Sequence, residues 1–153
     1  MLSIIFPIYN EKKNLSIFIP ELLKVIREMD TDFELIGVDD GSQDGSFDEL
    51  RAAAQKNPQM KVIRFRHNFG QTAALAAGIA AARGETVVTI DSDLENDPAD
   101  IPALIALLGK GYDAVSGWRQ GRWDDKPFTR KIPSRAANFL ISKIGGLCLH
   151  DYG

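Results

Sequence analysis

The sequence has one cysteine, Cys148, among its 153 residues. A single thiol excludes a disulfide framework and a four-cysteine metal site. No apolar run approaches the roughly 20 residues that span a bilayer, and no basic-then-apolar leader follows Met1. The chain also lacks the glycine-lysine loop of nucleoside triphosphatases, and no dinucleotide fingerprint follows its first apolar run. We therefore expect a globular domain that handles anionic ligands by other means.

What is present divides unevenly along the chain. Hydrophobic residues make up 44% and charged residues 25%, which excludes disordered, collagen-like and coiled-coil chains. The net charge of −3 conceals two parts. Residues 1–114 hold 11 basic and 18 acidic side chains, a net −7, whereas residues 115–153 hold 7 basic and 3 acidic, a net +4. An acidic body with a basic last quarter is an asymmetry that needs a functional reason.

Short apolar runs alternate with periodic segments. The runs predict strands over residues 2–6, 33–38, 61–65, 85–90 and 113–116. The periodic segments predict helices, one with the apolar stripe Leu22, Val25, Ile26 and Met29, the others opening near 46, 71, 98 and 134. This alternation predicts an α/β fold, a mostly parallel sheet with helices on both faces.

Local signals mark where these elements begin and end. We expect Pro7 to end the first strand, Pro20 to lie in the first turn of a helix, Ser46 to Glu49 to form a capping box, Gly84 to be a left-handed cap, Asp97 to cap the helix at Pro98, and Ser134 to cap the last helix. Ligands of such sheets bind beyond the carboxyl ends of the strands. The loops after the strands are therefore where function is expected.

Carboxylates cluster after the fourth predicted strand. Asp91 and Asp93 are two residues apart, so in extended chain both point to one side, and Glu95 follows as a third. Like charges this close favour a bound cation, and oxygen ligands suit Mg²⁺ or Mn²⁺. The alternative is a solvated turn whose aspartates only cap the next helix.

Loops after the other strands are also polar. Asp39 and Asp40 end the second strand, where they either form a simple turn or accept hydrogen bonds from a nucleotide. Tyr9 is placed to stack on a base and Glu11 to accept from a ribose. The segment 68–71 offers backbone N–H groups at a helix start, or a plain N-cap.

Most of the basic last quarter forms one arginine-rich stretch. Its cations are Arg119, Arg122, Lys126, Arg130, Lys131, Arg135 and Lys143. Arginine forks bind phosphate oxygens in pairs, which suits an anionic substrate or lipid headgroups. The alternative is a solvated face that pairs with Asp124 and Asp125. Nucleic acid is not expected as a partner, because the rest of the protein is acidic and lacks interleaved aromatic and basic residues.

These motifs together resemble a known family. They are Pro7-x-Tyr9-Asn10-Glu11, Val38-Asp39-Asp40-Gly41-Ser42-x-Asp44-Gly45, Asn68-Phe69-Gly70-x-x-Ala73-Ala74-Leu75, Asp91-x-Asp93-Leu94, Gly117-Trp118-Arg119, Arg130-Lys131-Ile132-Pro133-Ser134-Arg135-x-x-Asn138 and Asp151-Tyr152-Gly153. In this order they resemble family 2 glycosyltransferases of the GT-A fold. The segment 117–138 resembles their polyprenyl-phosphate branch, which includes dolichyl-phosphate mannose synthase and bacterial undecaprenyl-phosphate glycosyltransferases.

The resemblance implies roles for individual residues. The nucleotide-sugar ligands would be Pro7, Tyr9, Asn10, Glu11, Asp39, Asp40, Gly70, Gln71, Asp91 and Ser92. The ligands of Mg²⁺ or Mn²⁺ would be Asp91, Asp93 and Glu95, although the family commonly has Gln at the third position. The acceptor-phosphate ligands would be Arg119, Arg130, Lys131 and Arg135. The catalytic residues would be Asp151, Asp93, Arg119, Arg130 and Arg135, with Asp151 in the position discussed as the base. Asn96-Asp97-Pro98 departs from the family pattern, which puts the shape of that loop in doubt.

The implied function is metal-dependent, inverting transfer of a hexose from a UDP-glucose-like donor to a polyprenyl phosphate. The implied place is the cytoplasmic face of the inner membrane, with this piece soluble, a membrane surface as partner and homo-oligomerisation open. We expect residues 1–153 to be a GT-A catalytic domain cut at its C-terminal end. Its 1–114 part would bind donor and metal, and its 115–153 part the acceptor.

Three alternatives stay open on sequence alone. The first is a family 2 enzyme that acts on a polysaccharide or soluble sugar. The second is a nucleotide-sugar-binding module without catalysis. The third is a nucleotidyltransferase, which is disfavoured because its glycine-rich basic first loop is absent.

Overall fold

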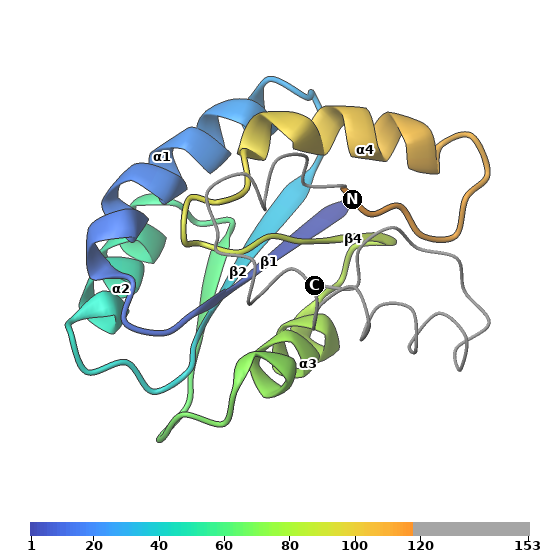
Figure 1. The fold of residues 1–153 in the computed structure, drawn as a ribbon. Coiled ribbons are helices and arrows are strands. Elements are labelled where there is room, and N and C mark those ends of the chain that lie inside the picture. Colours follow the sequence, from blue (N-terminus) through green and yellow to red (C-terminus); the bar gives the residue numbers. More distant parts are fainter. Residues whose placement is uncertain (118–153) are drawn as a thin grey trace, which may run out of the picture. The chain divides into compact units, whose positions relative to one another are not determined.

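The computed structural model describes residues 1–117, and it contains the predicted α/β architecture (Figure 1). Its sheet has four strands, β1 Leu2–Ile8, β2 Phe33–Asp39, β3 Met60–Arg64 and β4 Thr86–Thr89. Their order is β3-β2-β1-β4 and every pairing is parallel. The helices are α1 Lys12–Arg27, α2 Ser46–Lys56, α3 Gln71–Ala81, the 3₁₀ turn η1 Pro98–Asp100 and α4 Ile101–Leu108. The chain divides into a compact unit over Met1–Ala103 and a second over 104–153.

Helices pack on both faces of the sheet, as predicted. On one face, Phe6 of β1 meets Phe18 of α1 edge to face, with ring centroids 5.4 Å apart. On the other face, Ile5 and Val38 form a buried cluster with Ala74 of α3. Figure 1 shows α1 and α2 on one side of the strands and α3 on the other. The strands are thus buried from both sides, which explains their near-continuous apolar sequences.

Helix α1 begins earlier than its predicted start near Pro20. It opens at Lys12, so Pro20 lies inside the helix. Pro20 removes one backbone hydrogen bond, a change that costs about 3 kcal/mol. Six apolar side chains on one stripe of α1 are buried, at positions 15, 18, 19, 22, 23 and 26. Each contributes about 1.5–3 kcal/mol on burial, so packing outweighs the proline.

Pro7 does not end the first strand, which continues to Ile8. Ile8 faces β2, because its carbonyl accepts the Asp40 N–H at 2.8 Å. The backbone N–H and C=O groups of successive strand residues point alternately to the two neighbouring strands, so the backbone of Pro7 points to the β4 side. The β4 pairing has already ended at Ile5 opposite Thr89. Pro7 therefore lies where no backbone N–H is needed.

Two predicted caps are wrong. The residue before α2 is Gly45, with φ 92°, and Ser46 makes no capping box, because its hydroxyl bonds instead to Glu11 N–H and to Asp44. Gly84 is absent from the positive-φ glycines of the described residues and is no left-handed cap. A Cβ at this position would lie 2.7 Å from the Met1 carbonyl oxygen, so glycine lets the two backbone segments approach each other closely. The predicted cap at Asp97 is confirmed, since its Oδ1 accepts the Ala99 N–H at 2.9 Å.

A fifth strand over 113–116 is not formed in the described residues. Val115 is its one β-branched residue, and Asp and Ala are depleted in strands. The predicted last helix at Ser134, and the whole basic stretch from Arg119 onward, lie outside the described residues. No helix among residues 1–117 combines the length and the apolar character that crossing a membrane would require.

A buried carboxylate fastens the opposite, amino-terminal end of the sheet. Glu34 is 2% exposed and accepts from Ser3 Oγ at 2.8 Å, from the Arg83 N–H at 2.6 Å and from Lys61 Nζ at 2.7 Å. Burial alone would raise its pKa, but these hydrogen bonds outweigh burial and lower the pKa from 4.5 to about 2. The network joins β1, β2, β3 and the end of α3 away from the candidate site.

Candidate donor-binding site

A cavity of about 320 Å³ opens at the carboxyl ends of the strands. It is lined by Pro7, Ile8, Tyr9, Glu11, Asp40, Asn68, Gly70, Gln71, Asp91, Ser92 and Asp93. Nine of the residues predicted to bind donor or metal are among them. A larger hollow of about 620 Å³ lies between α1 and α2, and it contains none of the predicted residues. The chemistry-bearing side chains therefore converge on the smaller cavity.

The loops after β1 and β2 are fastened to each other. The Asn10 N–H donates to Ser42 Oγ at 3.0 Å, and Asn10 Oδ1 accepts the Gln43 N–H at 2.9 Å. Asn10 has φ 58°, a left-handed conformation that asparagine tolerates better than most residues. Asn10 was predicted to bind the nucleotide sugar, but it does not line the cavity. Its hydrogen bonds instead hold the loop that carries Tyr9 and Glu11.

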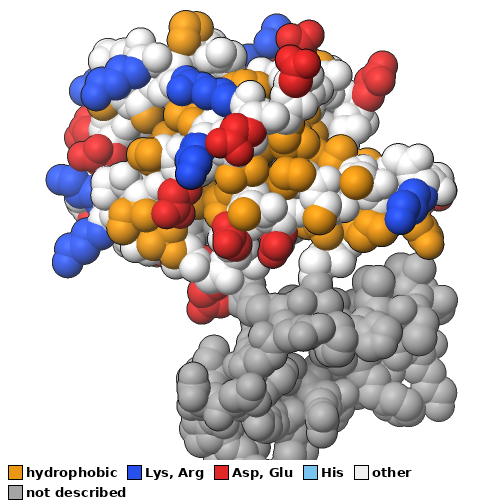
Figure 2. All heavy atoms as spheres, turned by 90° about the horizontal axis from the view of Figure 1, so that it is seen from above, with side chains coloured by type: hydrophobic (Ala, Val, Ile, Leu, Met, Phe, Trp, Pro, Cys, Tyr) orange, Lys and Arg blue, Asp and Glu red, His pale blue; other side chains and the backbone are white. Residues whose placement is uncertain are grey.

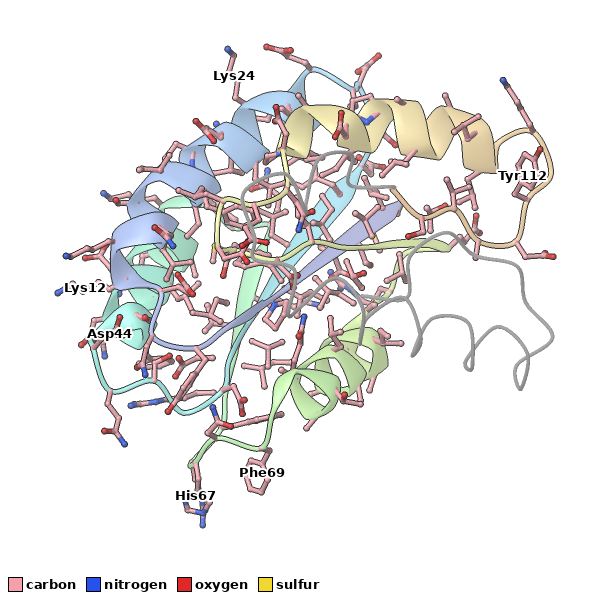
Figure 3. The ribbon with its side chains drawn as sticks, viewed as in Figure 1. Lys12, Lys24, Asp44, His67, Phe69 and Tyr112 are labelled. Carbon is pink, nitrogen blue, oxygen red and sulfur yellow. The ribbon has the colours of Figure 1, made fainter. Side chains whose placement is uncertain are left out.

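Asp44 caps two helices with one carboxylate. Its Oδ2 accepts the Lys12 N–H of α1 at 3.0 Å, and its Oδ1 accepts the Ser46 N–H of α2 at 2.9 Å. Burial alone would raise the pKa of Asp44, but the hydrogen bonds from Ser46 and Lys12 lower it. Figure 3 shows Lys12 and Asp44 together where α1 and α2 begin. Sequence reasoning quoted Asp44 in a motif without giving it this role.

Asp40 joins the end of β2 to the beginning of α3. Its two oxygens accept the Phe69 N–H at 2.7 Å and the Gly70 N–H at 2.8 Å. Gly70 has φ 90° and precedes the helix. These two N–H groups, which the sequence offered to a ligand, are already used by Asp40. Figure 3 shows Phe69 and His67 projecting from this loop, away from the body.

The loop after β4 is held on two sides. Gln71 Nε2 donates to Asp91 Oδ1 at 2.7 Å, which ties the loop to α3. Ser92 is 2% exposed, and its Oγ donates to the Pro7 carbonyl at 3.1 Å, which ties the loop to β1. The Ser92 hydroxyl thus donates to the protein backbone, whereas the Asp91 side chain lines the cavity.

Asp93 lines the cavity and shapes the same loop. Its Oδ1 accepts the Glu95 N–H at 2.9 Å, and Leu94 between them has φ 65°. Glu95 does not line the cavity. Within residues 1–117, no three acidic, histidine or cysteine side chains come close enough to hold a metal ion together. The predicted three-carboxylate arrangement is therefore not assembled here.

The carboxylates that line the cavity nevertheless suit an ion such as Mg²⁺. Glu11, Asp40, Asp91 and Asp93 place four carboxylates around one cavity. The hydrogen bonds described above to Asp40, Asp91 and Asp93 come from neutral amide groups. Mg²⁺ typically takes one or two protein carboxylates and completes its shell with water and substrate phosphates. Asp91 and Asp93, which both line the cavity, could supply such carboxylates.

Asp39 lies apart from the cavity. It is fully buried, with Oδ1 accepting the Ser42 N–H at 3.3 Å and Oδ2 3.6 Å from Arg64 Nε. That Oδ2 has no hydrogen-bond partner among the described residues. The Arg64 guanidinium also lies 4.2 Å from the centre of the Phe47 ring. The structure gives Asp39 a role in the β2 turn and does not bring it to the cavity lining.

Other predicted residues fall beyond the described part of the chain. They are Arg119, Arg130, Lys131, Arg135 and Asp151. Within it, sequence reasoning missed two lining residues, Ile8 and Asn68. Asn68 stands in a quoted motif beside Gly70, so its polar side chain after a strand was the available signal. On the face in Figure 2, acidic and basic side chains are interspersed and form no one-sign patch.

Comparison with known proteins now adds to this geometry. The family model described as glycosyl transferase family 2 matches residues 3–149. The chain therefore belongs to glycosyl transferase family 2. Solved structures support the GT-A fold: a mannosyltransferase from Pyrobaculum calidifontis in complex with GDP-Man and Mn²⁺ has a TM-score of 0.55 at 28% identity, over 67% of this chain and 30% of that one. S. aureus TarS in complex with UDP-GlcNAc has a TM-score of 0.59 at 25% identity, over 71% and 31%.

Curated relatives point to one branch of the family. The dodecaprenyl-phosphate galacturonate synthase of Rhizobium johnstonii is 41% identical over 99% of this chain and 45% of its own length. The undecaprenyl-phosphate 4-deoxy-4-formamido-L-arabinose transferase of Pseudomonas paraeruginosa is 39% identical over 100% of this chain and 45% of its own length. The chain thus spans a little under half of the relatives it matches.

Proposed function

We propose that this chain is the donor-binding part of a glycosyltransferase that moves a sugar from a nucleotide diphosphate to a polyprenyl phosphate. The observation that carries the proposal is the cavity at the carboxyl edge, where Asp91 and Asp93 face a pocket that also contains Tyr9 and Glu11. The names of the two curated relatives support the polyprenyl-phosphate acceptor. Those names contain two different sugars, galacturonate and formamidoarabinose. They therefore support a sugar donor but not the UDP-glucose-like donor in particular.

Each wall of the cavity has a part in holding the donor. Tyr9 is 46% exposed, which leaves its ring open for stacking on a base. Glu11, whose Oε2 accepts from Asn14 Nδ2 at 2.6 Å, faces the same cavity as a ribose acceptor. Asp91 and Asp93 would hold Mg²⁺ or Mn²⁺, which neutralises the charge that the diphosphate gains as it leaves.

The acceptor side belongs to the basic last quarter. In the proposed reaction, a phosphate oxygen of the lipid forms a bond to the anomeric carbon while the bond to the nucleotide diphosphate breaks, with inversion. That oxygen is already anionic near neutral pH, so it needs little help from a base. Arg119, Arg130, Lys131 and Arg135 would bind the phosphate, and Asp151 would orient it. Because the proposed acceptor is a membrane lipid, the reaction would take place at a membrane surface, which we propose is the cytoplasmic face of the inner membrane.

Transfer of labelled sugar tests the proposal. The enzyme is incubated with radiolabelled nucleotide sugars, Mn²⁺ and undecaprenyl phosphate, and the mixture is extracted with organic solvent. We expect label in the organic phase, and little label there with Asp93→Ala. Label only in water-soluble product would favour a sugar acceptor instead. A thermal-shift panel of nucleotide sugars with and without Mn²⁺ would identify the donor, because ligands stabilise the folded state.

A further inference from the structure

The carboxamide of Gln71 joins the beginning of α3 to the loop after β4. Gln71 is the first residue of α3, and Asp91 follows β4. Gln71 Nε2 donates to Asp91 Oδ1 at 2.7 Å, and both side chains line the cavity. The contact therefore fixes the position of one carboxylate relative to the helix, and it does so inside the proposed donor site.

The backbone of Gln71 is itself held in place. Asp40 accepts the N–H groups of Phe69 and Gly70, the two residues directly before it. The Gly70 carbonyl accepts the Ala73 N–H at 3.0 Å, which closes the first turn of α3. The carboxamide thus reaches Asp91 from a fixed point. On the other side of Asp91, the loop is held by Ser92 through the Pro7 carbonyl.

A neutral donor is well suited to a carboxylate that binds a cation. A hydrogen bond to Oδ1 sets the rotation of the carboxylate, and the amide does so without adding a positive charge of its own, as a lysine or arginine would. Partners that orient metal-binding carboxylates typically contribute about 10–100-fold to metal affinity. We infer that Gln71 is a positioning residue, which orients the Asp91 carboxylate toward a divalent cation. This inference rests on the proposed function of the site.

Two substitutions remove the contact with little change in size. Gln71→Met keeps the length of the side chain and loses the donor, and Gln71→Asn keeps a donor that is one methylene too short. Gln55→Met, on the exposed side of α2, is the matched control. Mn²⁺ affinity is measured by the paramagnetic resonance of free Mn²⁺, with UDP or GDP present. Affinity for UDP and GDP alone is measured by calorimetry in EDTA.

We expect both Gln71 variants to bind Mn²⁺ about tenfold more weakly, a loss clearly larger than any loss of their metal-free nucleotide affinity. Gln55→Met should match the unsubstituted chain in both. Unchanged Mn²⁺ affinity in either folded Gln71 variant would overturn the inference, and so would an equal loss of both affinities, which indicates general loosening. If the unsubstituted chain binds neither Mn²⁺ nor nucleotide, the proposed function fails and the inference with it.

Discussion

The carboxylate of Asp40 accepts the backbone N–H of Gly70 at 2.8 Å, and its second oxygen accepts the adjacent Phe69 N–H. One side chain at the end of β2 thereby sets where α3 begins. Gln71 follows in the helix and holds Asp91, so the contact reaches from β2 across to the loop after β4. The cavity walls are linked by hydrogen bonds rather than assembled independently.

Removing the Asp40 carboxylate should loosen this edge. Asp40→Ala leaves two backbone N–H groups without their acceptor, and we expect a loss of about 1–3 kcal/mol in the free energy of unfolding. Urea denaturation measures the loss, and faster hydrogen exchange at Phe69 and Gly70 locates it. Asp48→Ala, at an exposed position in the first turn of α2, should change stability little. Unchanged exchange at Gly70 would contradict the assignment.

Asp44 should matter more than its exposed position suggests. Asp44→Ala removes acceptors from the first turns of both α1 and α2, and each lost cap typically costs about 1 kcal/mol. Asp44→Asn should be milder, because its amide oxygen can still accept one N–H. A lower free energy of unfolding for Asp44→Ala than for Asp44→Asn, measured by chemical denaturation, would support capping of both helices. If both variants were as stable as the parent, the assignment would be wrong.

Gly78 should not accept a side chain. It lies buried in α3 against β1, and a Cβ there would collide with the Ile5 side chain and lie 3.4 Å from Val38. Ala improves helix propensity, but overpacking typically costs about 1–3 kcal/mol, so Gly78→Ala should lower the thermal midpoint. Gly117→Ala is the control, since no residue of the described part of the chain lies within 4 Å of a Cβ built at that position. A stabilised Gly78→Ala would show that α3 shifts freely on the sheet.

Acid should weaken the fold partly through Glu34. Its pKa of about 2 in the folded protein lies below its ordinary value of 4.5, so between these values the unfolded chain binds more protons. The stabilisation by Glu34, at most about 3 kcal/mol, is present above pH 4.5 and is lost as the pH falls toward 2. The difference in the free energy of unfolding between the parent and Glu34→Gln should therefore become smaller as the pH falls from 4.5 toward 2. Glu21→Gln, at an exposed position of α1, is the control for a charge removed outside this network.

Chelation and substitution at the aspartates should separate an enzyme from a binding module. We expect EDTA, Asp91→Ala and Asp93→Ala each to lower sugar transfer by orders of magnitude, because the leaving diphosphate would lose its counter-charge. Mn²⁺ should restore the chelated parent and not the variants. Variants that lose donor affinity while the parent shows no transfer under any condition would indicate a module that only binds.

Hydrophobic periodicity predicted most of the strands and helices in the described residues. Alternating strands and helices, with polar loops after the strands, were enough to anticipate the parallel sheet and the edge where the cavity lies. Boundaries failed where distant residues decide them. Pro20 reads as a helix start because proline is costly inside a helix, yet the buried stripe of α1 outweighs that cost.

The site was predictable in its membership more than in its roles. Asp39 and Asp40 are equivalent in a linear motif, but successive residues of a strand point to opposite faces. Asp40 therefore reaches the cavity and α3, while Asp39 turns to Arg64. Similarly, Asp91, Asp93 and Glu95 share one spacing, but Leu94 at φ 65° breaks the extended path before Glu95.

The amino-acid sequence by itself determined the fold class and the edge of the sheet that carries the carboxylates, because these follow from local periodicity and from the polar residues that follow the strands. It also determined the family, through the resemblance carried by its motifs. Only the tertiary structure decided which carboxylates line the cavity and which ones bind backbone N–H groups. Those partners are far apart in the chain, as Asp40 is from Gly70 and Gln71 from Asp91. Hydrogen bonds of this kind depend on distances of a few ångströms that only the packing of β2, α3 and β4 establishes.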